Sequence, residues 1–236
     1  MNVVITGASR GIGKAVAEIF AAQEYDLFLS SRNGVALYKA TEELMTKYPG
    51  ATIRAKPFDL SKKEEAMALG NWCLDFAVPD ILVNNAGLFE PGSVYNEPEG
   101  TLENQIATNL YSAYHLTRTL LPEMMKRPST EPGRHIFNIC SVASLHAYEN
   151  GGAYSISKFA LYGFSKNLRE EMKSYGIKVT SVHPGAVMTD SWGNFDNSSK
   201  RIMEAEDIAK MIYAASQLSP QACVEDIIIR PQLGDL

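Results

Sequence analysis

Short apolar runs alternate along the chain with longer stretches in which apolar residues recur every three or four positions. The short runs are typical of buried strands, and the longer stretches are typical of helices with one apolar face. Strands are predicted at Asn2–Thr6, Leu27–Ser31, Thr52–Phe58, Ile81–Asn84, Arg134–Ser141, Ile177–His183 and Glu225–Arg230. Helices are predicted at Gly11–Gln23, Gly34–Tyr48, Lys62–Phe76, Glu99–Lys126, Gly152–Tyr175 and Glu204–Gln217. The alternation predicts an α/β fold, a doubly wound parallel sheet of about seven strands with helices on both faces.

Length and composition narrow the class of protein. The 236 residues suit one large domain, so residues 1–236 are expected to form a single domain. The net charge of −5 and the scattered Lys and Arg residues argue against nucleic acid as a partner. Neither a membrane-spanning run nor a signal peptide is evident, so a cytoplasmic protein without a membrane role is expected. The three widely spaced cysteines predict reduced thiols, and no metal site is expected.

Three glycines lie between the first predicted strand and the first predicted helix. Gly7, Gly11 and Gly13 form the pattern Gly-x-x-x-Gly-x-Gly. A glycine-rich turn allows backbone N–H groups and the helix N-terminus to contact a pyrophosphate. The turn therefore predicts a dinucleotide site, and the alternative interpretation is a plain connection between a strand and a helix.

The end of the second predicted strand indicates which dinucleotide is bound. Proteins that bind NAD usually place an acid there to accept bonds from the ribose hydroxyls. This chain has Ser31 and Arg32 instead, and Arg10 lies in the glycine-rich turn. Two guanidinium groups that converge on the 2′-phosphate would favour NADP(H) over NAD(H). The alternative interpretation is that both arginines are solvated surface charges.

A phenol and an ammonium group are spaced to meet on one helix face. Tyr154 and Lys158 are four residues apart near the start of a predicted helix, and Ser141 ends the strand before it. A nearby cation is expected to lower the pKa of the phenol toward the range in which it exchanges protons. The pair by itself is also compatible with an ordinary amphipathic helix start.

With these motifs in place, the chain resembles the short-chain dehydrogenase/reductase family over essentially its whole length. The family's Asn-Asn-Ala-Gly motif is present at residues 84–87, and its adenine-facing acid corresponds to Asp59. The resemblance implies a Rossmann-type fold and a catalytic tetrad of Asn109, Ser141, Tyr154 and Lys158. It also implies that NADP(H) contacts Gly7, Ser9, Arg10, Gly11, Ile12, Gly13, Ser31, Arg32, Asp59, Leu60, Asn85, Ala86, Gly87, Tyr154, Lys158, Pro184, Gly185, Val187 and Thr189.

The resemblance further implies a reaction. A hydride passes between the nicotinamide and a carbonyl carbon, and Tyr154 gives its proton to the developing alkoxide. Lys158 would bind the nicotinamide ribose, Ser141 would orient the carbonyl group, and Asn109 would connect Lys158 to solvent through water. The family also suggests a homodimer or homotetramer packed through the two long predicted helices.

The substrate is expected to be a small carbonyl compound or alcohol, bound by loops that follow strand ends. The segments 184–193 and 224–231 resemble bacterial sepiapterin-reductase-type members, which suggests pteridine side-chain ketones or small diketones. Tyr148, Trp192 and Phe89 are candidates for flat apolar walls of the substrate site.

Two other functions are weighed against this one. A 3-oxoacyl-[acyl-carrier-protein] reductase is the alternative, but the chain lacks the glycine-rich segment that usually follows the last strand in that group. A non-catalytic NADPH-binding sensor or scaffold is the other alternative, and the intact tetrad argues against it.

Overall fold

A single parallel sheet organises the computed structural model, which describes residues 1–127, 133–189, 192–193 and 195–235. The strands of this part of the chain are β1 (Asn2–Thr6), β2 (Asp26–Ser30), β3 (Ile53–Ala55), β4 (Ile81–Asn84), β5 (His135–Ile139), β6 (Lys178–Pro184) and β7 (Asp226–Ile229). Their order in the sheet is β3-β2-β1-β4-β5-β6-β7. The order reverses between β1 and β4, and this is where ligands bind in open parallel sheets.

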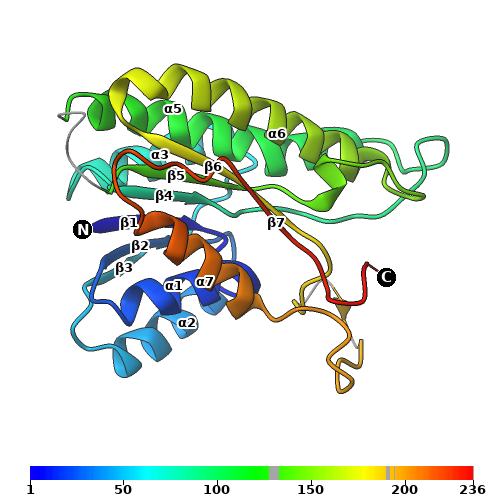
Figure 1. The fold of residues 1–236 in the computed structure, drawn as a ribbon, viewed down its shortest axis with the longest axis horizontal. Coiled ribbons are helices and arrows are strands. Elements are labelled where there is room, and N and C mark those ends of the chain that lie inside the picture. The colour runs from blue at the N-terminus through cyan, green and yellow to red at the C-terminus, as the bar shows by residue number, and fades with distance from the viewer. Residues whose placement is uncertain (128–132, 190–191, 194, 236) are drawn as a thin grey trace.

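Helices cover both faces of the sheet (Figure 1). One face carries α1 (Gly11–Ala21), α2 (Gly34–Lys47) and α7 (Ala205–Ser216). The opposite face carries α3 (Lys63–Leu74), α5 (Ser112–Met125) and α6 (Gly152–Met172), and the short α4 (Thr101–Ile106) packs against α6. The predicted doubly wound sheet is confirmed.

The core consists of two apolar layers, one on each side of the sheet. On β1, Val3 and Ile5 face the layer under α1 and α7, whereas Val4 faces the layer under α3 and α5. All three side chains are fully buried, as expected for a central strand covered on both faces. Burying one such side chain stabilises the fold by about 1.5–3 kcal/mol.

The predicted helix Glu99–Lys126 is not continuous. It consists of α4, a π-helical turn at Ala107–Tyr111, and α5. A π turn adds one residue to a single turn of the helix, and the loose apolar periodicity of this segment does not resolve so local a change of phase. Asn109 lies within this turn and is buried.

Strand β3 is shorter than the predicted Thr52–Phe58. Its ladder ends at Ala55, and Pro57 lacks the N–H group needed to continue the pairing. Most other predicted ends differ from the observed ones by one or two residues. Among the described residues, no helix is long and apolar enough to cross a membrane.

Candidate active site

A cavity of about 1470 Å³ lies at the carboxyl ends of the strands. Its walls come from segments that are far apart in sequence, including the loops after β1, β2, β4, β5 and β6. Nearly all predicted site residues line it: Gly7, Ser9, Arg10, Gly11, Ile12, Ser31, Arg32, Asp59, Leu60, Asn85, Ala86, Gly87, Ser141, Tyr148, Tyr154, Lys158, Pro184, Gly185, Val187, Thr189 and Trp192. Gly13 and Asn109 are the two predicted residues that do not belong to the lining.

The glycine-rich turn has a backbone that only glycine adopts easily. Gly7 and Gly11 have φ angles of +63° and +54°, in the left-handed region. A Cβ atom on Gly13 would collide with the carbonyl oxygen of Gly7 and with Nδ2 of Asn85. Asn85 Nδ2 donates to the carbonyl oxygens of Thr6 and Gly7, at 2.9 and 3.2 Å, which joins the end of β4 to this turn.

Helix α1 begins inside the turn, at Gly11, with its N-terminus at the cavity. Its N-cap residue, Arg10, has extended backbone angles and makes no side-chain cap. The first N–H groups of an α-helix have no partner within the helix, and they carry the positive end of its dipole. This end of the cavity is therefore suited to an anion such as a pyrophosphate.

Two exposed arginines and one acid define the far end of the cavity. Arg10 and Arg32 both line it and are exposed. Asp59 accepts hydrogen bonds from the hydroxyl and backbone N–H of Ser61, at 2.7 and 3.3 Å. The Ser61 hydroxyl is the main reason that the pKa of Asp59 is lowered, with smaller contributions from Lys62 and Arg32. Asp59 is therefore an ionised acceptor near the expected adenine position.

Lys158 and Tyr154 lie together at the other end of the cavity. The ammonium of Lys158 is buried, donates to the carbonyl oxygen of Ile139 at 2.8 Å, and lies 5.8 Å from the centroid of the Tyr154 ring. Burial lowers the pKa of Lys158 to about 8, because the charged form loses its hydration.

The expected lowering of the Tyr154 pKa is not observed. Tyr154 is only partly buried as a residue, but its phenol is poorly solvated, and burial raises its pKa to about 12. A hydrogen bond with Ser141 acts in the opposite direction and is the smaller effect. The phenol in this structure is therefore held in its protonated form, with its ring packed edge-on against Phe89 at 4.8 Å between centroids.

Ser141 is held in a short turn that the strand pattern did not predict. The residue lies two positions after the end of β5 and caps a 3₁₀ turn at Val142–Ser144, in which its Oγ accepts from the Ala143 N–H at 3.1 Å. Ser144 closes the turn, since its Oγ accepts from the Ser141 N–H at 3.3 Å and donates to the Ser141 carbonyl oxygen. The usual sequence signal of a capping box has Glu or Gln three residues after the serine, and this chain has Ser144 there, so little in the sequence indicated the turn.

Asn109 joins the loop after β4 to α6. Its Nδ2 donates to the Leu88 carbonyl oxygen at 3.0 Å and to Ser157 Oγ at 2.8 Å, and its Oδ1 accepts from the Leu88 N–H at 2.6 Å. A Cβ on Gly87 would lie 3.3 Å from Asn109 Oδ1 and 3.6 Å from Lys158 Nζ. Asn109 therefore shapes the backbone beside Lys158, and its expected water-mediated link to solvent stays a prediction.

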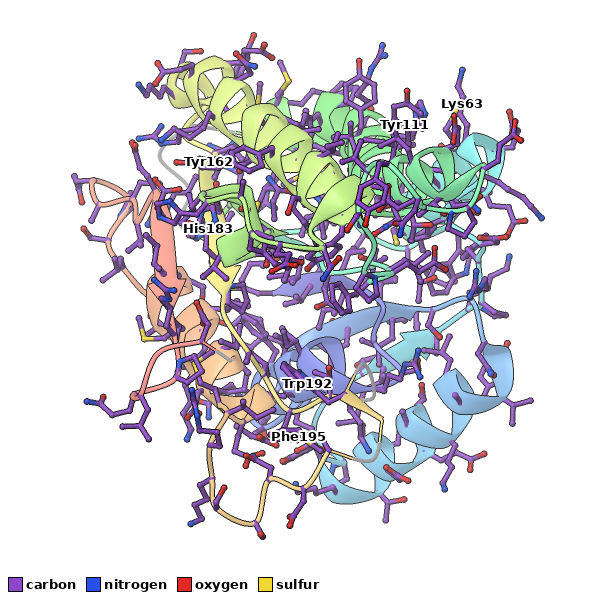
Figure 2. The ribbon with its side chains drawn as sticks, turned by 90° about the vertical axis from the view of Figure 1, so that its right-hand side faces the viewer. Lys63, Tyr111, Tyr162, His183, Trp192 and Phe195 are labelled. Atoms are coloured by element: carbon purple, nitrogen blue, oxygen red, sulfur yellow. The ribbon has the colours of Figure 1, made fainter. Side chains whose placement is uncertain are left out.

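The segment after β6 closes the cavity over the glycine-rich turn. The Thr189 methyl lies 3.1 Å from the position that a Cβ on Gly11 would occupy. Val187 is buried and forms an isolated β-bridge with Met203. Figure 2 shows Trp192 and Phe195 next to each other on this segment, with 5.2 Å between ring centroids. Residues 190, 191 and 194 lie outside the described part of the chain.

Two charged residues after β7, Arg230 and Asp235, also line the cavity and were not among the residues predicted from the sequence. Arg230 forms an ion pair with Asp235 Oδ2, and Arg201 donates to the carbonyl oxygens of Gly234 and Asp235 at 2.9 and 3.1 Å. Asp235 Oδ1 is buried and has no hydrogen-bond partner among the described residues. An arginine and an acid five residues apart, directly after the last strand, were the available signal.

Comparison with known proteins identifies the family. Residues 1–200 match the family model described as short chain dehydrogenase. The chain belongs to the short-chain dehydrogenase family. This short-chain dehydrogenase is 33% identical over 243 aligned residues to a protein named sepiapterin reductase from Chlorobaculum tepidum, with 99% of this chain and 97% of that protein covered. An uncharacterised oxidoreductase of Staphylococcus saprophyticus is 29% identical, with 97% of this chain and 96% of that protein covered.

Solved structures show the same fold. An alcohol dehydrogenase from the archaeon Thermococcus sibiricus, complexed with 5-hydroxy-NADP, has a TM-score of 0.89 at 26% identity and covers 98% of this short-chain dehydrogenase and 96% of its own chain. L-Sorbose reductase from Gluconobacter frateurii, complexed with NADPH and L-sorbose, has a TM-score of 0.85 at 25% identity, with 97% and 94% covered. The family resemblance and the fold class predicted from the sequence are both confirmed.

Proposed function

We propose that this short-chain dehydrogenase is an NADPH-dependent reductase that converts a ketone or aldehyde into an alcohol, with Tyr154 as the proton donor. The observation that carries the proposal is one continuous cavity. Ser141, Tyr154 and Lys158 line one end of it, and the glycine-rich turn with Arg10 and Arg32 lines the other. The alcohol dehydrogenase and the sorbose reductase of the same fold, solved with NADP-type dinucleotides, support the choice of cofactor.

The residues present fit NADP(H). Gly7 and Gly11 of the glycine-rich turn line the cavity, and the first turn of α1 has no side-chain cap. Arg10 and Arg32 would bind the 2′-phosphate, and Lys158 would bind the nicotinamide ribose. When bound, the cofactor supplies the hydride.

The protein side of the reaction is a proton transfer. Because the pKa of Tyr154 is raised to about 12, the phenol keeps its proton at neutral pH and is able to act as an acid. An alkoxide is a stronger base than a phenolate, so the proton passes from Tyr154 Oη to the substrate oxygen as the carbonyl carbon is reduced. The ammonium of Lys158 stabilises the phenolate that remains, and the Ser141 hydroxyl orients the carbonyl group.

We propose pteridine side-chain ketones or small diketones as substrates. The relative named sepiapterin reductase supports the first class. Three aromatic side chains of the cavity lining, Phe89, Tyr148 and Trp192, suit a flat ring.

We also propose that this short-chain dehydrogenase forms a homodimer or homotetramer. Several large apolar side chains of α4, the π turn and α6 are exposed in the single chain: Leu102, Tyr111, Ile156 and Phe159. Burial of such side chains between identical subunits is a common reason for symmetric association.

The test of the proposed function is NADPH oxidation, followed at the absorbance band of NADPH, with sepiapterin, small diketones, aromatic aldehydes and acetoacetyl thioesters. We expect turnover with sepiapterin or diketones. Tyr154→Phe is expected to lower kcat by about 10²–10⁴-fold, because it removes the transferable proton, while the Kd for NADPH changes less than about twofold.

Tyr175→Phe is the matched control, because Tyr175 lies in a 3₁₀ turn after α6 and does not line the cavity. It is expected to retain wild-type kcat. Turnover of thioesters alone would indicate a 3-oxoacyl-[acyl-carrier-protein] reductase. Binding of NADPH without turnover of any carbonyl compound would indicate a non-catalytic sensor.

A further inference from the structure

A buried histidine braces the turn that carries Ser141. His183 precedes Pro184 on β6 and is fully buried. Its Nδ1 lies 2.9 Å from Ser144 Oγ and 3.2 Å from the Ser141 carbonyl oxygen. Ser144 Oγ in turn contacts both the N–H and the carbonyl oxygen of Ser141. The imidazole therefore supports the backbone on both sides of the Ser141 side chain.

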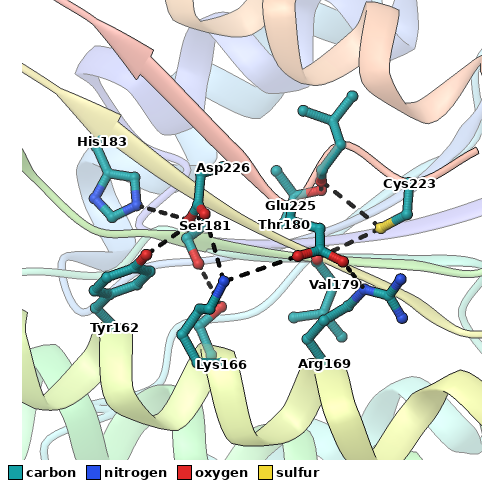
Figure 3. Close-up of polar contacts among 12 residues, drawn as sticks. Tyr162, Lys166, Arg169, Val179, Thr180, Ser181, His183, Cys223, Glu225 and Asp226 are labelled. Atoms are coloured by element: carbon teal, nitrogen blue, oxygen red, sulfur yellow. Dashed lines mark hydrogen bonds and ion pairs between the residues drawn. The ribbon is translucent and has the colours of Figure 1, made fainter.

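The imidazole is itself held by two other elements (Figure 3). Its Nε2 lies 3.2 Å from Asp226 Oδ1 on β7, and the Tyr162 ring of α6 packs perpendicular to it at 4.7 Å between centroids. Asp226 Oδ2 also contacts Tyr162 Oη at 3.4 Å and Lys166 Nζ at 3.5 Å. A chain of polar contacts thus runs from the surface of α6 to the active-site turn.

The hydrogen-bond roles in this chain follow from the chemistry of the partners. An ionised carboxylate only accepts, so Asp226 fixes a proton on Nε2 of His183. Nδ1 is then an acceptor, and it shares the single proton of the Ser144 hydroxyl with the Ser141 carbonyl oxygen. Both nitrogens of the ring therefore have a partner, and the Tyr162 ring packs against it.

We propose that His183 is a positioning residue for the reaction: through Ser144 it holds the turn at Val142–Ser144 so that the Ser141 hydroxyl meets Tyr154 and the substrate oxygen. The inference rests on the proposed reductase function. Misplacing a catalytic group by about 1 Å is able to cost on the order of 10²-fold in rate. Loss of the contact between His183 and Ser144 is therefore expected to change kcat more than it changes the Kd for the cofactor.

Two amide variants test the contacts of the two ring nitrogens of His183 separately. His183→Asn places an amide near Nδ1 and keeps a partner for Ser144, whereas His183→Gln reaches toward Nε2 and keeps a partner for Asp226. We expect His183→Leu and His183→Gln to lower kcat by about 10²-fold with the best carbonyl substrate of the panel above, and His183→Asn to stay within about threefold of wild type. The Kd for NADPH is expected to stay within about twofold in all three. Equal kcat values for the Asn and Gln variants would overturn the proposal.

Ser144→Ala tests the same contact without altering the buried imidazole. It is expected to reproduce the loss of kcat, and its effect is expected not to add to that of His183→Leu, because both remove one linkage. Ser181→Ala is the matched control, since Ser181 is a buried β6 serine whose hydroxyl contacts Ser165 instead of the turn. If Ser144→Ala retains wild-type kcat, His183 does not act through the turn.

A second readout needs no turnover. The ¹³Cζ resonance of Tyr154, assigned with Tyr154→Phe, reports its hydrogen bond with Ser141. We expect this resonance to shift in His183→Leu and Ser144→Ala but not in Ser181→Ala. An unchanged resonance in the first two variants would refute the positioning role. A wild-type protein that reduces no carbonyl compound would refute the proposed function instead. The Tyr154 resonance would still test whether His183 positions the turn.

Discussion

Burial sets the protonation of the two central side chains of the active site. It raises the pKa of Tyr154 to about 12 and lowers the pKa of Lys158 to about 8. Both shifts have the same cause, since each charged form loses hydration that the cavity does not replace. A protonated phenol beside a buried ammonium group is arranged to donate a proton, which is the direction required for reduction of a carbonyl group.

The preference for NADPH over NADH is expected to depend on a single residue, Arg32. If Arg32 binds the 2′-phosphate, Arg32→Asp places a repelling carboxylate there that accepts bonds from ribose hydroxyls. We expect the ratio of kcat/KM for NADPH to kcat/KM for NADH to fall by about 10–100-fold, the size of one charge-assisted hydrogen bond. Steady-state kinetics with both cofactors measures it.

Lys47→Asp makes the same change of charge at the far end of α2, where Lys47 is exposed and pairs with Glu18. This control is expected to leave the cofactor ratio unchanged. A ratio that Arg32→Asp also leaves unchanged would remove Arg32 from the phosphate site.

At the scale of elements, β5 carries a buried histidine at the end opposite the active site. His135 stacks on Phe137 with 3.9 Å between ring centroids, and its Nε2 lies 2.6 Å from Thr180 Oγ1 on β6. Burial, helped by the charges of Lys178 and Arg169, lowers the pKa of His135 to about 3. The strand therefore packs around an imidazole that is uncharged at neutral pH.

This burial predicts a loss of stability in mild acid. The pKa of His135 is about 6.5 in the unfolded chain and about 3 in the folded one, so below about pH 6.5 only the unfolded chain takes up the proton. The free energy of unfolding is expected to fall by about 1.4 kcal/mol for each pH unit below that point, until about pH 3. Urea unfolding at pH 7.5, 6.0 and 5.0 measures the slope.

His135→Gln keeps a donor for Thr180 but does not titrate. This variant is therefore expected to lose the part of the pH dependence of the free energy of unfolding that comes from His135. His146→Gln removes an exposed histidine instead and is expected to keep the wild-type slope. Identical slopes in the wild type and the His135→Gln variant would show that protonation of His135 does not oppose folding.

For the whole molecule, the exposed apolar side chains of α4, the π turn and α6 predict association. We expect sedimentation velocity to show a dimer or tetramer for the wild type. Phe159→Asp is expected to shift it toward the monomer, because Phe159 is 44% exposed in the single chain and a carboxylate resists burial.

Val35→Asp is the matched control for this surface. Val35 is 83% exposed on α2, on the opposite face of the sheet, so its replacement is expected to leave the assembly unchanged. A monomeric wild type, or an oligomer that Phe159→Asp does not weaken, would contradict the proposed interface.

The sequence alone determined the elements and the family. Hydrophobic periodicity located every strand of the sheet, and the glycine-rich turn, the Asn-Asn-Ala-Gly motif and the spacing of Tyr154 and Lys158 identified the family. These features are local, since each depends on residues within a few positions of one another or on the order of motifs along the chain.

Only the tertiary structure decided how the site is held. Three features appear only in the packed chain: the π turn that contains Asn109, the contact between His183 and Ser144, and the position of Asp235 at the cavity. The contacts of these residues join segments that are distant in sequence. The raised pKa of Tyr154 also appeared only there, because the four-residue spacing indicates a nearby cation but not the loss of water around the phenol. Hydration and contacts between elements depend on the packed chain, so no local pattern encodes them.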